Sequence, residues 1–129
     1  MFMKTYEDIT LILPTLNEEQ TIVKSIKYVL KEFPEMKILV VDGNSKDRTA
    51  EIVKEFASQN KNVSLLQNSA VIDGVEKAKT KYIISLDEDL QHPLNKIKII
   101  AEKLKQGNDV VIDVLNGFMG FKRSLFISA

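Results

Sequence analysis

The sequence contains no cysteine and a single histidine, His92. Without cysteine there can be no disulfide, thiol nucleophile or cysteine-bound zinc, and one histidine excludes a centre with several histidine ligands. Positively and negatively charged residues number 18 each, so no net positive field exists to hold nucleic acid by its phosphates. Any chemistry must therefore rest mainly on carboxylates, amides and hydroxyls.

Long apolar runs are also missing. The longest cover five or six residues, around Ile38–Val41, whereas a membrane-spanning helix needs about 20. The first ten residues lack the apolar stretch of a signal peptide. We therefore expect a soluble cytoplasmic protein. Peripheral contact with the cytoplasmic face of a membrane is compatible with this expectation, because surface docking needs no spanning segment.

What the sequence does contain is an alternation of short β-branched runs with helical patterns, over a length typical of one domain. This alternation predicts an α/β fold with a Rossmann-type open sheet, mostly parallel, and helices on both faces. Buried strands are predicted at 9–13, 37–41, 63–66, 81–86 and 109–112, and helices at 17–32, 47–57, 70–79 and 93–106.

The end of the chain departs from this alternation. Only Asp113–Asn116 separates the fifth predicted strand from Gly117–Lys122. A crossover between parallel strands needs a dozen or more residues. Either the last segment therefore runs antiparallel, which is our prediction, or a connection present in relatives is absent.

Polar clusters follow four of the predicted strands. Ligands of open α/β sheets bind beyond the carboxyl ends of the strands, and parallel strands end at a common edge. The clusters therefore predict one site at that edge. They are Pro14–Glu19, Asp42–Asp47, Asp87–His92 and Asp113.

The cluster Asp87-Glu88-Asp89 carries the clearest chemistry. Residues i and i+2 of an extended chain share a face, so Asp87 and Asp89 point the same way and repel each other unless a cation lies between them. Oxygen ligands of this kind suit Mg²⁺ or Mn²⁺, and Gln91 can add a carbonyl oxygen. The alternative is a solvated acidic turn that caps the helix beginning at Pro93.

The two earlier clusters each have two interpretations. Asp42 either accepts hydrogen bonds from a nucleobase or bonds its own loop, in which Gly43 and Asn44 tolerate positive φ. Asn17 and Glu18 either present backbone N–H groups and a carboxylate to a nucleotide or simply begin a helix, whose dipole favours acidic residues. Asp47 in the second cluster is a candidate N-cap.

Three basic or titratable residues also keep two interpretations. His92 precedes a proline at a helix start, and it either lines the site or lies on the polar surface. Lys122 and Arg123 lie near the end of the sequence, where they either clamp a phosphate or face solvent.

The clusters together resemble the family-2 glycosyltransferases, and most of all the dolichyl- or polyprenyl-phosphate mannose and glucose synthases. The resemblance spans nearly the whole chain and implies a GT-A fold, a nucleotide-sugar donor and a divalent metal. The matching segments are ILPTLNEEQTI (Ile12–Ile22), VVDGNSKDRT (Val40–Thr49), SLDEDLQHP (Ser85–Pro93) and NGFMGFKRSLF (Asn116–Phe126).

The resemblance also implies roles for individual residues. Pro14, Asn17 and Glu18 match the first nucleotide-binding loop, and Asp42 matches the aspartate that contacts the base. The family often has a second aspartate where this chain has Gly43.

At the metal, Asp87 matches the first carboxylate of the family's D-x-D motif, and Asp89 and Gln91 match its metal and diphosphate ligands. Asp87 and Asp89 are thus the catalytic candidates. Asn44, Lys122 and Arg123 are further substrate-binding candidates, the last two toward the acceptor phosphate or the donor diphosphate.

The function implied is metal-dependent, inverting transfer of a hexose from a GDP-mannose or UDP-glucose type donor to a polyprenyl or dolichyl phosphate. We expect one GT-A-like domain over 1–129, with the nucleotide sugar bound by 1–92 and a truncated acceptor side in 93–129. An acceptor phosphate is already ionised at neutral pH, so no strong general base is needed.

Two segments are shorter than in the family, after Leu66 and after Ile112. They are either true deletions or stretches left out of the sequence. If the acceptor region is missing, the alternative is a nucleotide-sugar-binding remnant without turnover. A receiver-type phosphoacceptor domain is disfavoured, because such a domain would have an acidic pair in place of Asn17-Glu18 and a lysine in place of Asp113.

Overall fold

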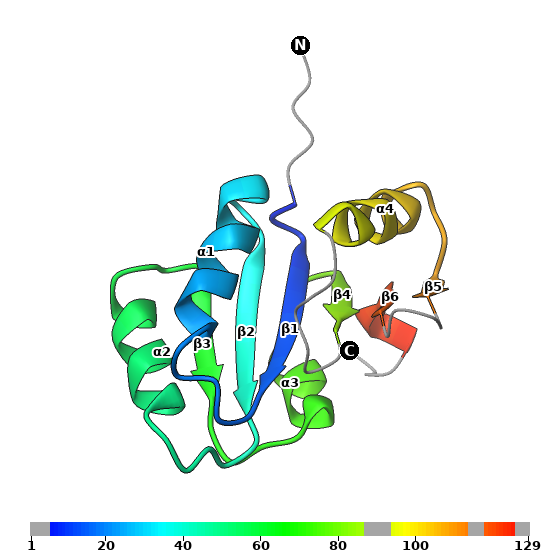
Figure 1. The fold of residues 1–129 in the computed structure, drawn as a ribbon. Coiled ribbons are helices and arrows are strands. Elements are labelled where there is room, and N and C mark those ends of the chain that lie inside the picture. The colour runs from blue at the N-terminus through cyan, green and yellow to red at the C-terminus, as the bar shows by residue number, and fades with distance from the viewer. Residues whose placement is uncertain (1–5, 87–93, 114–117, 126–129) are drawn as a thin grey trace.

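The computed structural model describes residues 6–86, 94–113 and 118–125 (Figure 1). Strands and helices alternate along the chain up to the last two strands, as the sequence predicts. The elements are β1 (Ile9–Thr15), α1 (Ile22–Glu32), β2 (Lys37–Asp42), α2 (Thr49–Ser58), β3 (Val63–Leu66), α3 (Val71–Lys77), β4 (Tyr82–Ser85), α4 (Leu94–Lys105), β5 (Val110–Asp113), β6 (Phe118–Lys122) and the 3₁₀ turn η1 (Arg123–Leu125).

The strands form one six-stranded sheet in the order β3-β2-β1-β4-β6-β5. Neighbouring strands are parallel from β3 to β4, while β6 is antiparallel to both β4 and β5. The predicted α/β sheet, mostly parallel with an antiparallel C-terminal strand, is confirmed. The short connection before β6 is therefore explained by its antiparallel direction.

The central strands β1, β2 and β4 are buried on both faces because they are apolar at successive positions. On one face Leu11 and Leu13 belong to a core that includes residues of α1, α2 and α4. On the other face Ile12 and Ile83 pack with Val75 of α3. Each fully buried Leu or Ile contributes about 1.5–3 kcal/mol. The prediction of helices on both faces is confirmed.

The first helix begins later than predicted. Residue 17 was expected to open it, but α1 starts at Ile22. Asn17 has a φ of 52°, a left-handed conformation that a right-handed helix cannot contain. The N–H of Ile22 donates to the carbonyl of Glu18 at 3.0 Å, so residues 18–22 make only a turn leading into the helix. The preceding residues belong to a loop.

Strand β6 packs very closely against α4. A Cβ added to Gly120 would overlap Cγ2 of Ile100 and lie 2.9 Å from Cδ1 of Leu104. Both of these α4 residues are buried. Only glycine therefore fits at this position of the antiparallel strand.

Among the described residues, no helix has the length and apolar character needed to cross a membrane.

Candidate functional site

The carboxyl ends of β1 and β2 lie side by side. Thr15 is in register with Asp42, and both residues are only 2% exposed. Two loops leave the sheet here and lie together at its lower end in Figure 1. We call 16–21 the first loop and 43–48 the second loop. This edge is where the sequence places its nucleotide-binding candidates.

Asp42 is a buried carboxylate at this edge. Its Oδ2 accepts the N–H of Ser45 at 3.0 Å, and its Oδ1 accepts the Ser45 hydroxyl. Its backbone carbonyl accepts the N–H of Ser69 at 3.0 Å, which ties in the segment after β3. The structure thus contains the hydrogen bonds expected if Asp42 bonds its own loop. A carboxylate has about four lone-pair sites, so two remain for the predicted contact with a base.

The second loop turns tightly after Asp42. The N–H of Gly43 donates to the carbonyl of Thr15 at 3.0 Å, and the left-handed conformation falls on Asn44, with φ 77°. Asn44 is exposed beside the buried Asp42. Its side chain is therefore accessible to a ligand at this edge, as a substrate-binding candidate must be.

The backbone N–H groups of the first loop point at the second loop and the start of α2. The N–H of Asn17 donates to Ser45 Oγ at 2.9 Å, that of Glu18 to Thr49 Oγ1 at 2.8 Å, and that of Glu19 to Asp47 Oδ2 at 3.2 Å. These three groups already have acceptors within the protein. The interpretation in which they bind a nucleotide stays a prediction.

The side chain of Asn17 makes the same connection in the opposite direction. Its Oδ1 accepts the N–H of Lys46 at 2.7 Å and lies 3.4 Å from the N–H of Asp47. All of these contacts join residues of the first loop to residues that lie 28 to 31 positions later in the chain. The connection between the two segments is therefore a tertiary one.

Asp47 sits at the start of α2 and is ionised at neutral pH. Partial burial raises the pKa of its carboxyl group, but hydrogen bonds from the hydroxyl and N–H of Thr49 and from the N–H of Glu19 outweigh burial and lower that pKa below the ordinary value. The N–H of Thr49 donates to Oδ1 at 2.9 Å. Asp47 therefore holds the first residue of α2, much as a capping residue would.

The remaining candidates of the first cluster also lie at this edge. Glu18 Oε2 accepts the hydroxyl of Thr15 at 3.1 Å. Pro14 lies in β1 beyond Ile12, the last residue that pairs with β4, so β1 has a strand neighbour on only one side there. A proline, which has no N–H to donate, is tolerated at such a position.

The fourth and fifth strands end at the same edge. Ser85 of β4 pairs with Met119 of β6, which pairs in turn with Ile112 just before Asp113. The catalytic and metal-binding candidates Asp87, Asp89 and Gln91, and also His92, lie outside the described residues. Within the described ranges, no group of three acidic or histidine side chains could hold a metal.

Lys122 and Arg123 are not brought to this edge. Lys122 pairs with Tyr82 at the start of β4, and Tyr82 pairs with Ile9 at the start of β1. Both basic residues thus lie at the opposite edge of the sheet from Asp42. Lys122 Nζ is 3.1 Å from Asp109 Oδ1, in an ion pair. Their predicted role toward a phosphate of the acceptor or the donor stays a prediction.

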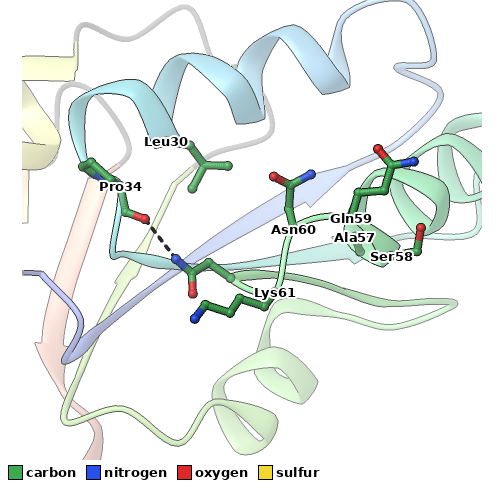
Figure 2. Close-up of a pocket in the computed structure, with 8 residues that line it drawn as sticks. Leu30, Pro34, Ala57, Ser58, Gln59, Asn60 and Lys61 are labelled. Carbon is green, nitrogen blue, oxygen red and sulfur yellow. Dashed lines mark hydrogen bonds between the residues drawn. The ribbon is translucent and has the colours of Figure 1, made fainter.

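A hollow of about 660 Å³ lies at the ends of α1 and α2, also away from Asp42 (Figure 2). The Asn62 amide in its wall donates to the carbonyl of Pro34 at 2.9 Å. None of the described residues that line it is acidic, so these residues offer no carboxylate pair for a divalent metal. Its lining is Leu30, Pro34, Ala57, Ser58, Gln59, Asn60, Lys61 and Asn62.

The sequence model of glycosyl transferase family 2 matches residues 10–124, which include both loops and all six strands except the first residue of β1. The chain belongs to this family. The resemblance drawn from the sequence is thereby confirmed.

Relatives and solved structures agree with this assignment. An undecaprenyl-phosphate 4-deoxy-4-formamido-L-arabinose transferase of Edwardsiella ictaluri is 32% identical over 120 residues. That match covers 84% of this chain but 37% of the relative, so the chain spans little more than a third of the relative's length.

Two solved structures share the fold at low identity. The mannosyltransferase PcManGT of Pyrobaculum calidifontis, in complex with GDP-Man and Mn²⁺, has a TM-score of 0.69 at 17% identity, over 92% of this chain and 45% of that one. Glucosyl-3-phosphoglycerate synthase of Mycobacterium tuberculosis, in complex with Mn²⁺, UDP and glucosyl-3-phosphoglycerate, has a TM-score of 0.65 at 16% identity, over 91% of this chain and 57% of that one. The GT-A fold is confirmed.

Sequence reasoning missed the role of the second loop as a hydrogen-bonding partner of the first. Asp47 was read only as a helix cap, and Ser45 and Thr49 were not singled out. Their spacing could have indicated this role. Ser45, Asp47 and Thr49 place a hydroxyl, a carboxylate and a hydroxyl at every second position, and the last of them begins a helix. The partners of these groups, however, lie in a distant part of the chain.

Proposed function

We propose that this chain transfers a hexose from a GDP- or UDP-linked donor to a polyprenyl or dolichyl phosphate. The observation that carries the proposal is the family match over both loops, together with the buried Asp42 at the carboxyl edge of the sheet. The Edwardsiella ictaluri relative is named as an undecaprenyl-phosphate transferase, which supports a polyprenyl phosphate acceptor.

The donor base would bind at Asp42. Uracil and guanine both present N–H donors, and two lone-pair sites of the Asp42 carboxylate are not used by Ser45. The solved neighbours with GDP-Man and with UDP support either nucleotide. Pro14, Glu18 and Asn44 would line the remaining nucleotide-binding surface, while Asn17 would hold the loops together.

A divalent cation, Mg²⁺ or Mn²⁺, would be held by Asp87, Asp89 and Gln91. Two carboxylates and an amide carbonyl are oxygen ligands, which fit these ions. When bound, such a cation neutralises the charge that develops on the leaving diphosphate. The neighbours crystallised with Mn²⁺ support this cofactor class.

The transfer itself would invert configuration at the sugar. An oxygen of the acceptor phosphate attacks the anomeric carbon and forms the new C–O bond. The C–O bond to the donor diphosphate breaks on the opposite face, and the nucleoside diphosphate leaves with the electron pair. Because the acceptor phosphate is ionised at neutral pH, no side chain has to remove a proton.

The donor and the acceptor would be bound by different parts of the chain. Residues 1–92 carry both loops and the predicted metal ligands, so we assign the donor to them. Residues 93–129 would form part of the acceptor side, at the cytoplasmic face of a membrane where a lipid-linked phosphate is reached from the surface. The basic residues Lys122 and Arg123 are left out of the donor site because they lie at the opposite edge.

The test is transfer by the full chain with Mn²⁺, labelled GDP-mannose or UDP-glucose and a polyprenyl phosphate. Wild-type protein should form the lipid-linked sugar, and Asp89→Asn should lower the rate at least 100-fold. Asp109→Asn is the matched control, because this exposed aspartate pairs with Lys122 away from the proposed site. Full metal-dependent transfer by Asp89→Asn would exclude the assignment.

A second candidate is a domain that binds the nucleotide sugar without turnover. The observation in its favour is that only four residues separate β5 from β6, where the family resemblance implies a longer segment of the acceptor side. Calorimetry separates the two functions. Donor binding in the presence of Mn²⁺ with no product from any acceptor supports the binding domain, and product formation excludes it.

A further inference from the structure

Two hydroxyl groups link the two loops in the same way. The N–H of Asn17 donates to Ser45 Oγ at 2.9 Å, and the Ser45 hydroxyl donates in turn to the carboxylate of Asp42. The N–H of Glu18 donates to Thr49 Oγ1 at 2.8 Å, and the Thr49 hydroxyl donates to Asp47. Each relay thus runs from a backbone N–H of the first loop, through a hydroxyl, to a carboxylate.

The two relays end at carboxylates in different environments. Asp42 is 2% exposed and lies at the edge where the nucleotide is proposed to bind. Asp47 is half-buried and holds backbone N–H groups of Glu19 and Thr49, at the start of α2. The two relays use the same kinds of groups, but only the first ends at a residue that is proposed to bind the donor.

Ser45 also contacts Asp42 through its backbone. Its N–H binds Oδ2 while its hydroxyl binds Oδ1, so both carboxylate oxygens are held by one residue. Hydrogen bonds to a charged group strengthen when they are linked in a chain and shielded from water. This arrangement fixes the rotation of the carboxylate and therefore the directions of its unused lone pairs.

We propose that Ser45 is a positioning residue for donor binding: by holding both oxygens of Asp42, it aims the remaining lone pairs at the N–H groups of the nucleobase. This inference rests on the proposed function, in which Asp42 meets the base. It assigns Ser45 an effect on nucleotide affinity, whereas Thr49 affects only the stability of the loops.

The test compares three variants of the full chain, Ser45→Ala, Ser45→Thr and Thr49→Val. Calorimetry measures the affinity for UDP and GDP, and for UDP-glucose and GDP-mannose, all with Mn²⁺. Steady-state transfer gives KM and kcat, and a thermal melt gives Tm. Thr49→Val is the matched control, because it removes a hydroxyl relay of the same length that ends at Asp47.

Ser45→Ala should weaken binding of the preferred nucleotide about 5- to 20-fold, since one hydrogen bond to a charged group is lost and the carboxylate can rotate. KM for the donor should rise by a similar factor while kcat changes less than threefold. Ser45→Thr, which keeps the hydroxyl, should restore affinity to within threefold of wild type. Thr49→Val should lower Tm but leave nucleotide affinity within twofold.

Two results would overturn the inference: Ser45→Ala binding the nucleotide like wild type, or Ser45→Ala and Thr49→Val weakening binding in proportion to their loss of Tm. Failure of the proposed function looks different. A wild-type chain that binds UDP or GDP but transfers no sugar contradicts the transferase assignment, while the affinities of the variants still decide the role of Ser45. A wild type that binds neither nucleotide contradicts both.

Discussion

Asn17 in the first loop shows why the sequence predicted only part of the chemistry of the two loops. Asn17 was expected to begin a helix or to meet a nucleotide. It does not begin the helix, because its φ is 52°, and its amide oxygen accepts the N–H of Lys46. Its contact with a nucleotide stays a prediction. Asparagine is among the few residues that adopt this conformation readily. Its partners are tertiary, so no local pattern could reveal them.

The pKa of Asp47 makes loop stability depend on pH. Because that pKa is lower in the folded protein than its ordinary value of 3.8, the carboxylate favours folding once it is ionised. Its contribution is therefore fully present above about pH 5. It is lost as the pH falls through 3.8 toward the folded-state pKa.

Urea unfolding at pH 7 and pH 3 tests this prediction. Asp47→Asn keeps the size of the side chain but cannot ionise, so it should destabilise the protein at pH 7 and have less effect at pH 3. Asp109→Asn serves as the charge control, because Asp109 lies outside both loops. An equal effect of Asp47→Asn at both pH values would contradict the assigned role of its charge.

At the scale of elements, strands were predicted more accurately than helix starts. The β-branched runs place β3 at the predicted residues, and β1 and β2 extend by one or two residues beyond theirs. Buried strands are marked by their own composition. The start of α1 depends instead on the second loop and the first residue of α2, which hold residues 17–19 outside the helix.

The β6 strand shows how direction decides which residues share a site. The short connection before it predicts an antiparallel strand, and this is correct. An antiparallel strand carries its carboxyl end away from the edge where β1, β2 and β4 end. The sequence left open whether Lys122 and Arg123 bind a phosphate or face solvent, because their distance from that edge follows from strand register rather than from residue type.

The contact between β6 and α4 yields a prediction at this scale. Gly120→Ala should destabilise the protein by about 1–3 kcal/mol, because its Cβ would overlap Ile100 in a packed core. Chemical denaturation measures the loss. The double variant Gly120→Ala/Ile100→Ala should be more stable than the sum of the single effects, since removing the Ile100 side chain beyond Cβ makes room. Strict additivity of the two effects would show that this contact is not the cause.

At the scale of the whole molecule, the sheet joins residues that are far apart in the sequence at one edge. The ends of β1 and β2 are described in full, and the predicted metal ligands Asp87 and Asp89 directly follow β4 and Leu86. The fold class and the family could be predicted because alternation and motifs repeat over most of the chain. The donor sugar and the acceptor could not, because no local residue pattern in this chain identifies either of them.

A ligand that binds the folded state raises stability by an amount set by its concentration over its Kd, about 2.7 kcal/mol at a hundredfold excess. Because the predicted metal ligands follow β4 and the loops follow β1 and β2, donor and cation together would stabilise three strand ends. UDP-glucose or GDP-mannose with Mn²⁺ should therefore raise Tm, whereas either sugar nucleotide with EDTA should raise it less. AMP with Mn²⁺ is the control. A rise of equal size with AMP would mean that the edge does not select a donor base, and no rise with any nucleotide would contradict a donor site.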